Sequence, residues 1–397
     1  MPKRSREIRE PPDPEALCAL FEHARAPTFG VEEELMVLDG RTLDLAPRAR
    51  ELIGATSDQP AFKLELPASQ LEVVSPARDS VAQLALDLYL GRARLAAAVA
   101  GRAQLAAVGA HPFAAAEGEL NGGDRYERIE REYGSVIRRQ LICGLHVHVG
   151  LSGPERVVAV YNALRSHLPE LAALAANAPM HGGRDSGMAS VRPGIAGTLP
   201  RQGIPPAYES LHDYARDLAW GAAAGRLQRP GEWWWELRIH AELGTLEVRV
   251  ADAQRCAADA AAVVATVCGL VLWLAARHDA GELGGPAPGW RIAENRWSAA
   301  RHGVHGQMLD LASGAPTPSK RRLHSLLDEL EPFAAAVGGG EHIARAHRLA
   351  ERNGADWQRA VAGEQGIDGL MEQLTAAFLQ RPSWLLEDVA DGEPAPG

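Results

Sequence analysis

The sequence contains little lysine and few cysteines. Only Lys3, Lys63 and Lys320 are lysines among its 397 residues, although lysine and arginine together number 41. We therefore expect arginine to make the contacts to anionic groups, since its guanidinium offers two parallel N–H groups to a carboxylate or phosphate. The four cysteines lie far apart and form no Cys-x-x-Cys pair. This spacing argues against a disulfide-stabilised fold or a structural zinc ribbon and predicts a reducing compartment.

Signals for a secretory leader, a membrane span or a nucleic-acid surface are also missing. The first residues are charged and lack an apolar segment, and the net charge is -10 with no basic cluster. Residues 260–276 form an uncharged run of about 17 residues, the lower limit for crossing a bilayer, so a buried core helix is the preferred interpretation. We therefore predict a soluble, cytoplasmic protein that binds neither nucleic acid nor membranes.

The remaining composition is that of a folded domain, with 46% hydrophobic residues. Strands are predicted at 29–38, within 64–75, and at 141–151, 233–238 and 244–251. Helices are predicted at 15–23, 79–107, 155–177, 260–276, 294–301, 319–330, 341–352 and 356–379. Strands scattered among helices and joined by irregular segments favour an α+β fold with a mainly antiparallel sheet.

No internal repeat or interdomain linker divides the chain. We predict one domain over residues 26–387, an N-terminal arm with a short helix over 1–25, and a disordered tail over 388–397. Residues 179–206 are rich in glycine, proline, serine and arginine and show no periodicity. Long irregular segments of this kind are usually functional, so a lid or binding loop is predicted here.

Polar residues stand two positions apart on four of the predicted strands. Each pair shares one face of its strand, because alternate side chains point to the same side. Taken singly, a pair of this kind can also be a solvated strand face or a surface ion pair. If the four strands lie side by side, their polar faces form one wall of carboxylates, imidazoles and a guanidinium. The pairs are Glu32 and Glu34, Gln70 and Glu72, His146 and His148, and Glu247 and Arg249.

A wall of this composition suits Mg²⁺ or Mn²⁺, which prefer carboxylate oxygens and accept a histidine nitrogen. Beside an arginine it also suits phosphoryl transfer, because divalent cations bridge phosphate oxygens and the guanidinium stabilises the charge that develops. The sequence has no Walker A loop with its lysine. Metals and arginines would therefore have to hold the phosphates of a bound nucleotide.

Two other interpretations remain open at this point. In a zinc-dependent hydrolase, His146 and His148 would bind zinc and a carboxylate would activate water. That interpretation leaves the acidic pairs without a shared purpose, and it needs further histidine ligands in a recognisable pattern. In a non-catalytic protein, the same face would only bind a nucleotide or metabolite. The other histidines considered as ligands are His111, His181 and His240.

Taken in order, the motifs resemble those of the carboxylate-amine ligases of the glutamate–cysteine ligase type 2 (YbdK-like) family. The resemblance covers about residues 29–301, most of the chain. It implies a glutamine-synthetase-like catalytic domain, in which a curved antiparallel sheet has helices on its outer face and the active site on its concave face. The motifs are GVEEE, SQLE, CGLHVHVG, NAPMHGGRDSGMASVR, LGTLEVRVAD and ENRW.

The resemblance implies an ATP-dependent ligase that joins a glutamate-like carboxylate to an amine such as cysteine through an acyl phosphate, releasing ADP and phosphate. ATP and Mg²⁺ or Mn²⁺ are the implied cofactors, and a homodimer is the implied assembly. Carried over by motif, the implied metal ligands are Glu32, Glu34, Glu72, His146 and Glu247. Arg249 and Glu34 are the implied catalytic residues, while His148 and Arg192 would bind the nucleotide or substrate. Weaker candidates for the same pocket are Arg184, Asn177 and His111.

The chain departs from the family pattern at Trp233–Arg238. Glu236 stands where the pattern has aspartate, and Ile239 stands where it has proline. Either the longer side chain reshapes the pocket wall, or Glu236 forms an ion pair with Arg238 beneath the sheet edge. Cys143, next to the histidine strand, is interpreted as a small core residue, since no local signature supports a nucleophile.

Overall fold

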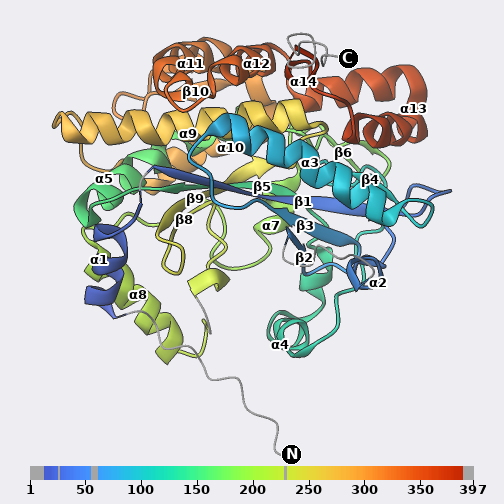
Figure 1. The fold of residues 1–397 in the computed structure, drawn as a ribbon, viewed down its shortest axis with the longest axis horizontal. Coiled ribbons are helices and arrows are strands. Elements are labelled where there is room, and N and C mark those ends of the chain that lie inside the picture. The colour runs from blue at the N-terminus through green and yellow to red at the C-terminus, as the bar shows by residue number, and fades with distance from the viewer. Residues whose placement is uncertain (1–12, 26, 55–60, 228–229, 388–397) are drawn as a thin grey trace, which may run out of the picture.

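A seven-stranded sheet lies at the centre of the protein. The computed structural model describes residues 13–25, 27–54, 61–227 and 230–387 (Figure 1). Every pair of neighbouring strands in this sheet is antiparallel, so the predicted α+β fold with an antiparallel sheet is confirmed. The strand order is β2 (Phe62–Leu64), β3 (Gln70–Val74), β1 (Thr28–Leu38), β5 (Gly144–Gly150), β9 (Thr245–Asp252) and β8 (Leu237–His240), and β4 (Gln104–Ala106) also pairs with β1.

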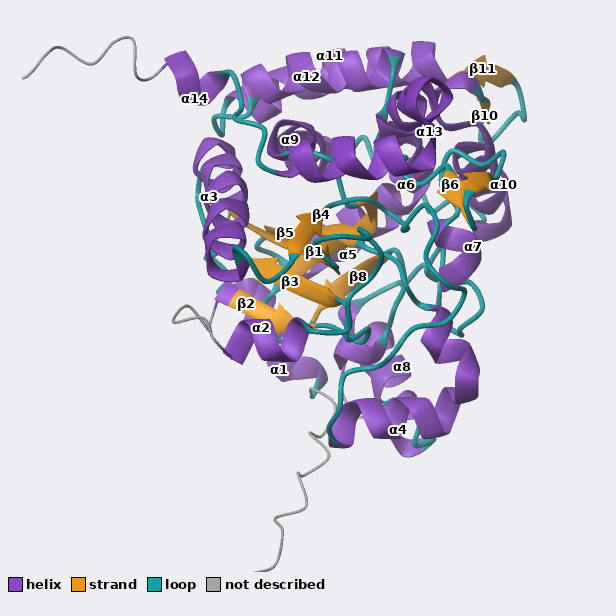
Figure 2. Ribbon diagram, turned by 90° about the vertical axis from the view of Figure 1, so that its right-hand side faces the viewer, coloured by secondary structure: helices purple, strands orange, loops and turns teal. Residues whose placement is uncertain are grey.

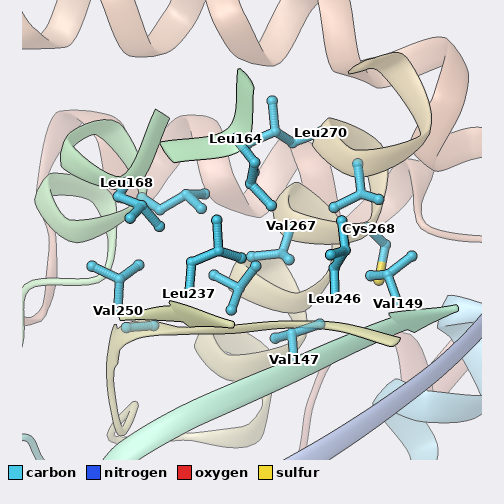
Figure 3. Close-up of a cluster of buried hydrophobic side chains, with 14 of the residues drawn as sticks. Val147, Val149, Leu164, Leu168, Leu237, Leu246, Val250, Val267, Cys268 and Leu270 are labelled. Carbon is cyan, nitrogen blue, oxygen red and sulfur yellow. The ribbon is translucent and has the colours of Figure 1, made fainter. Parts of the chain in front are cut away.

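One face of the sheet is apolar and is covered by helices. Strands β5 and β9 direct Val147, Val149, Leu246 and Val250 toward α9 (Ala257–Asp279), where they pack under Val267, Cys268 and Leu270 (Figure 3). Helix α3 (Val81–Val99) lies beside α9 over β1 and β3. A second layer, formed by α11 (Ser319–Ala335) and α12 (Gly340–Glu351), packs on α9 (Figures 1 and 2).

Helix α9 is the core helix that the sequence predicts at 260–276. It is the one helix in the described part of the chain that is long and apolar enough to cross a membrane. However, 83% of its most apolar window is buried inside the protein. Its side chains therefore pack between the sheet and the outer helices.

The opposite face of the sheet is polar and carries the open side of the molecule. Helices α4 (Asp124–Tyr133) and α8 (Leu211–Ala223) lie on this side, away from α9 and α11 (Figure 2). Neither helix was predicted from the sequence. Helix α4 is dominated by charged residues and buries only Ile129, so it has too few apolar residues to stand out in the sequence.

Two predicted helices are shorter than expected. The helix predicted over 79–107 ends at Val99, because Gly101 turns the chain with a φ of 72° and β4 follows. The helix predicted over 155–177 is divided into α5 (Pro154–Leu164), η3 (Arg165–His167) and α6 (Leu168–Leu174). Pro169 contributes to the division, since proline has no N–H to donate and therefore fits only the first turn of α6.

The irregular segment 179–206 contains a small hairpin and one short helix, and it is otherwise without regular structure. Its elements are β6 (Met180–His181), β7 (Arg184–Asp185) and α7 (Arg192–Ala196). The strand predicted at 233–238 forms further along the chain, as β8. The predicted arm at 1–12 and the predicted tail at 388–397 lie outside the described residues. The remaining elements are α1 (Pro14–Glu22), α2 (Ala49–Gly54), η2 (Gly134–Arg139), η4 (Pro230–Glu232), α10 (Gly289–His302), η5 (Gly303–His305), β10 (Gln307–Leu309), β11 (Pro316–Pro318), α13 (Gly354–Phe378) and α14 (Trp384–Glu387).

A buried ion pair joins the sheet to α3. Glu33 lies on β1 between two candidate site residues but points to the helical face, where Arg92 donates to it from Nε (2.9 Å) and Nη2 (2.5 Å). Both side chains are fully buried. Arg92 also donates to three backbone carbonyls, so most of its N–H groups are satisfied. On the same helix, Gly91 lets α3 approach β3, since a Cβ there would lie 2.6 Å from Val73.

We predict that Glu33→Gln destabilises the protein by about 3–5 kcal/mol, because it leaves the Arg92 charge buried without a counter-charge. Urea unfolding followed by circular dichroism measures this free energy. Arg25→Gln, which removes one partner of an exposed pair with Asp79, serves as the control and should change the midpoint little. An unfolding midpoint for Glu33→Gln equal to that of the control would contradict the assignment.

Candidate active site

The polar residues predicted from the four strands form one row across the polar face of the sheet. The register of the strands sets this row, because residues directly opposite each other on antiparallel strands point to the same side. The sheet therefore brings together every candidate metal ligand taken from the sequence. The directly opposed pairs are Glu72 and Glu34, Glu32 and His146, His148 and Glu247, and Glu247 and Arg238.

Three groups within this row have the composition of metal sites. In each group the ligand atoms all lie within 4.8 Å of one another. Neighbouring groups share Glu32 or Glu72, so the three sites would be adjacent. The groups are Glu32, His148 and Glu247; Glu32, Glu72 and His146; and Glu34, Glu65 and Glu72.

The donor set fits hard divalent cations. Each group offers carboxylate oxygens and at most one histidine, a combination that suits Mg²⁺ or Mn²⁺. The Nε2 atoms of His146 and His148 are buried and have no hydrogen-bond partner in the described part of the chain, which leaves them available as ligands. Among the described residues no such group contains two histidines, so His146 and His148 do not form the shared zinc site of the hydrolase interpretation.

Glu65 and Lys63 belong to this site but were missed in the sequence. The Lys63 ammonium lies 3.0 Å from Glu32 and 3.1 Å from Glu72, and Glu65 completes the third group. A signal for them exists, since Lys63 and Glu65 stand two positions apart, as the recognised pairs do. This pair does not stand out as a strand pattern, because β2 is only three residues long and Glu65 lies just beyond it.

Crowding of buried carboxyls shifts their pKa values upward at one end of the row. Burial, together with the charge of Glu72, raises the pKa of Glu34 to about 7, although Arg192 and Arg249 act against the shift. Burial and the charge of Glu34 raise the pKa of Glu65 to about 7. Burial and the charge of Glu65 likewise raise the pKa of Glu72 well above its usual value. These three carboxyls therefore hold protons near neutral pH that a divalent cation would displace.

Arginines hold the carboxylate at the other end of the row in its ionised form. Burial alone would raise the pKa of Glu247, but the charges of Arg238 and Arg249 outweigh it and place the pKa well below its usual value. Both arginines donate directly to this carboxylate. Burial and the charge of Arg249 lower the pKa of His146 to about 3, so its ring is neutral and able to bind a metal.

Arg249 lies on the same face of β9 as Glu247, because the two residues are two positions apart on the strand. A bulge lies beside it. Leu145 pairs with Ala251 while Val147 pairs with Val248, so between these pairs one residue of β5 faces two residues of β9. The Nη1 atom of Arg249 lies 3.3 Å from Nδ1 of His146, beside the metal-binding groups.

Arg192 enters the site from α7. It donates from Nη2 to the Arg249 carbonyl (3.1 Å) and from Nη1 to the Val250 carbonyl (3.3 Å). Its Nε is buried and has no hydrogen-bond partner among the residues that the structure describes. Gly144 makes room for it, since a Cβ there would collide with the guanidinium, and the Gly144 N–H donates to Glu34. Arg192 therefore has a free donor beside the row of carboxylates.

A cavity of about 380 Å³ opens on this face. Its sheet wall includes Glu34, His146 and Arg249, and α4 closes another side with Tyr126 and Ile129. Residues 192–203 also line it, so the second half of the irregular segment is the part that meets the candidate site. The residues of β6 and β7 do not line this cavity.

The weaker candidates lie outside the cavity and have structural contacts. The Nε2 of His111 lies 2.9 Å from the Leu43 carbonyl, and its Nδ1 accepts from the Ala114 N–H at 2.9 Å. Asn177 is buried and donates to the Ala253 carbonyl at 2.7 Å. Arg184 is exposed on β7. None of the three is among the described residues that line the cavity.

Two further predictions can be compared with the structure. The proposed Glu236–Arg238 ion pair is wrong. Arg296 of α10 donates to both carboxylate oxygens of Glu236, at 2.8 Å and 3.0 Å from Nε, while Arg238 is occupied by Glu247. Glu236 precedes β8 and lines the cavity. Cys143 is buried, and burial raises the pKa of its thiol well above the usual value, which agrees with a core residue.

Comparison with known sequences identifies the family. The chain matches the family described as Glutamate-cysteine ligase family 2 (GCS2) over residues 28–377. A "Putative glutamate--cysteine ligase 2-3" of Rubrobacter xylanophilus is 38% identical over 345 residues, which cover 85% of this chain and 93% of that protein. A "Putative glutamate--cysteine ligase 2" of Jannaschia sp. is 33% identical over 373 residues, with coverage of 91% and 96%.

Solved structures share the fold at low sequence identity. The glutamate–cysteine ligase from Francisella tularensis in complex with AMP superimposes with a TM-score of 0.67 and 13% identity, covering 94% of this chain and 93% of that one. A bifunctional glutathione synthetase from Pasteurella multocida gives a TM-score of 0.59 at 16% identity, covering 91% of this chain and 53% of that one. At these identities the likeness shows the fold.

The sequence match and the polar face of the sheet define an enzyme of the carboxylate–amine ligase class. The chain belongs to glutamate–cysteine ligase family 2, and the resemblance drawn from its motifs is confirmed. This membership favours a ligase over the zinc hydrolase and over the non-catalytic binding protein.

The raised pKa values of Glu34 and Glu65, both about 7, predict that cation binding depends on pH. Below that value protons compete for the carboxylates. The affinity for Mn²⁺ should therefore rise about ten- to a hundredfold between about pH 6 and about pH 8. Titration followed by electron paramagnetic resonance measures this affinity, and Glu65→Gln should flatten the rise. An affinity that is already constant across this range would show that the carboxyls ionise at their ordinary pKa.

Proposed function

We propose that this protein is an ATP-dependent ligase that joins the carboxylate of a glutamate-like substrate to an amine such as cysteine. One observation carries the proposal. Adjacent groups of carboxylates and histidines lie beside Arg249, and members of these groups line a cavity large enough for small molecules. Those members are Glu34, Glu65 and His146. The names of the relatives in family 2 support glutamate and cysteine as the substrates.

The residues that would hold Mg²⁺ or Mn²⁺ are those of the three groups: Glu32, Glu34, Glu65, Glu72, His146, His148 and Glu247. When bound, the cations would supply positive charge to the phosphate oxygens of ATP. The unpartnered Nε2 atoms of the two histidines and the protonated carboxyls fit this role. His148, predicted to face the nucleotide phosphates, stands here with Glu32 and Glu247, so we propose it as a ligand as well.

The reaction would have two steps. An oxygen of the substrate carboxylate attacks the γ-phosphorus of ATP, and the bond from this phosphorus to the β,γ-bridging oxygen breaks. ADP is released and the substrate becomes an acyl phosphate. The amine nitrogen then attacks the acyl carbon, phosphate leaves, and the nitrogen loses a proton to give the amide. This activation is needed because a carboxylate does not react with an amine at neutral pH.

The roles of the two arginines follow from their positions. Arg249 is held by Glu247 beside His146, and its guanidinium would stabilise the charge on the phosphoryl group during transfer. Arg192 keeps its Nε free beside Glu34 and would bind a phosphate or carboxylate oxygen. Glu34 faces the cavity between them and would hold a cation next to the reacting groups. Residues 192–203 would keep water from the acyl phosphate.

The direct test of the proposal is ADP release from ATP in the presence of Mg²⁺ and L-glutamate. Release should depend on an added amine, and mass spectrometry should find the corresponding amide. L-cysteine and a panel of other amines identify the acceptor. Folded protein that releases no ADP with any amine would contradict the proposal for glutamate as the carboxylate.

Glu72→Gln should lower kcat by about 100-fold or more, because it removes an oxygen ligand shared by two of the groups. The substitution is close to isosteric, and the carboxyl it replaces already tends to stay protonated, so the fold should be kept. The Mg²⁺ concentration needed for half-maximal rate should also rise. Glu351→Gln, on the exposed side of α12, is the matched control. Wild-type kinetics in Glu72→Gln would show that Glu72 is not a metal ligand of this site.

Arg249→Lys should lower kcat by about 100- to 1000-fold, with a smaller effect on the KM for ATP. A lysine ammonium is a single point charge, and it cannot contact Glu247 and a phosphoryl oxygen together in the way a planar guanidinium can. Steady-state kinetics measures both constants, with Arg216→Lys on the surface of α8 as the control. A normal kcat in Arg249→Lys would place this arginine outside the transfer step.

A further inference from the structure

Arg201 lies in the same cavity but has no part in the row of carboxylates. It lines the cavity together with Gln202, Gly203 and Trp234. Its backbone has a φ of 59°, in the left-handed region that non-glycine residues rarely adopt. Strain of this kind persists only where the surrounding structure enforces it, and it is concentrated at functional positions.

Two contacts hold the Arg201 side chain in one place. Its Nη2 donates to the Tyr133 hydroxyl at 2.7 Å, and its guanidinium lies over the Trp234 ring, 5.8 Å from the ring centroid. The rings of Tyr133 and Trp234 are themselves in contact, with centroids 5.5 Å apart. The loop is fixed as well, because the Glu236 N–H donates to the Gly203 carbonyl at 3.0 Å.

The charge of Arg201 is left without a counter-charge by these contacts. Within the described ranges its Nε is buried without a hydrogen-bond partner, and its guanidinium forms no ion pair with a carboxylate. By contrast, Arg296 on the same cavity wall is neutralised by Glu236. A fixed guanidinium with a buried, unused donor is a site for an anion, because the unsatisfied N–H costs free energy until it is paired.

The surroundings favour a carboxylate over a phosphate. Arg201 stands at the apolar end of the cavity, where Trp234 packs with the buried side chains of Ile129, Ile137 and Leu199. The metal-binding groups and Arg249 belong to the sheet wall instead. A single planar guanidinium stacked on an indole matches one planar, singly charged carboxylate, whereas a chain of phosphates needs several cations.

We propose that Arg201 binds a carboxylate of an amino-acid substrate that is not the carboxylate being activated. Arg201 would thereby fix the substrate from one end while the other end reaches the row of carboxylates and Arg249. This inference rests on the proposed ligase function for the identity of the ligand as a substrate. The carboxylate comes either from the glutamate-like substrate or from an amino-acid acceptor, and both have the same chemistry.

Paired substrates separate the two sources. L-glutamate is compared with 4-aminobutyrate, which keeps the reacting carboxylate but lacks the other one. L-cysteine is compared with cysteamine, which lacks its carboxylate. In one of these two pairs, Arg201→Gln should lower kcat/KM by about 30- to 100-fold for the substrate that carries the extra carboxylate. It should leave kcat/KM for the truncated member, and the KM for ATP, unchanged.

Two further variants guard against a merely structural effect. Tyr133→Phe removes the hydrogen bond that positions Arg201, and it should raise the KM for the same substrate a few-fold without changing kcat. Arg201→Lys keeps the charge and should recover part of the loss. Arg216→Gln, an exposed arginine on α8, is the matched control and should behave as wild type.

The proposal is overturned if Arg201→Gln lowers kcat/KM equally for both members of each pair, or if the KM for ATP rises instead. If the wild-type protein forms no amide, the proposed function fails separately. Calorimetric titration then decides the question for Arg201, because glutarate should bind the wild type at least tenfold more tightly than butyrate. This preference should vanish in Arg201→Gln. Equal binding of the two acids by the wild type, together with equal binding of L-cysteine and cysteamine, would also overturn the proposal.

Discussion

Mutual repulsion between carboxylates on one face of a sheet is the constraint on which the site depends. The strand register forces these side chains together, and the protein balances their charge differently at each end of the row. At one end Arg238 and Arg249 keep Glu247 ionised. At the other end burial and the charge of Glu72 outweigh the nearby Arg192 and Arg249 and leave Glu34 holding a proton near neutral pH. The unbalanced end is therefore where divalent cations would gain most by binding.

The opposite face of the same strands supplies the rigidity that this arrangement needs. Apolar residues alternate with the site residues and pack against α3 and α9. These helices hold the strands of the site in place from the other face of the sheet. The fully buried Glu33–Arg92 pair lies within the same β1 segment and ties it to α3. The open face instead carries α4 and the 192–203 loop, which line the cavity. The sheet thus carries the charged groups of the site, and the loop and helix shape the cavity that a substrate would enter.

Strand periodicity explains which parts of the site could be predicted from the sequence. The alternation of Glu32 with Glu34 and of His146 with His148 fixes their common face whatever the tertiary structure, and the motif order supplied the strand neighbours. Side chains that pair across long distances in the sequence leave no local sequence pattern from which the pair could be predicted. Arg296 was not expected to pair with Glu236, and Arg201 lies in an irregular loop. Helix ends were misplaced where a glycine or proline overrides apolar periodicity, as after Val99.

The central claim is that this sheet face transfers a phosphoryl group from ATP to a substrate carboxylate before the amide forms. The most direct measurement uses L-glutamate with ¹⁸O in its side-chain carboxylate, followed by mass spectrometry of the inorganic phosphate released with the amide. The account predicts that one ¹⁸O atom passes from each glutamate into phosphate, with ADP as the other product. Unlabelled phosphate, or ¹⁸O recovered in AMP, would contradict an acyl phosphate and with it the roles given to Arg249 and the metal-binding carboxylates.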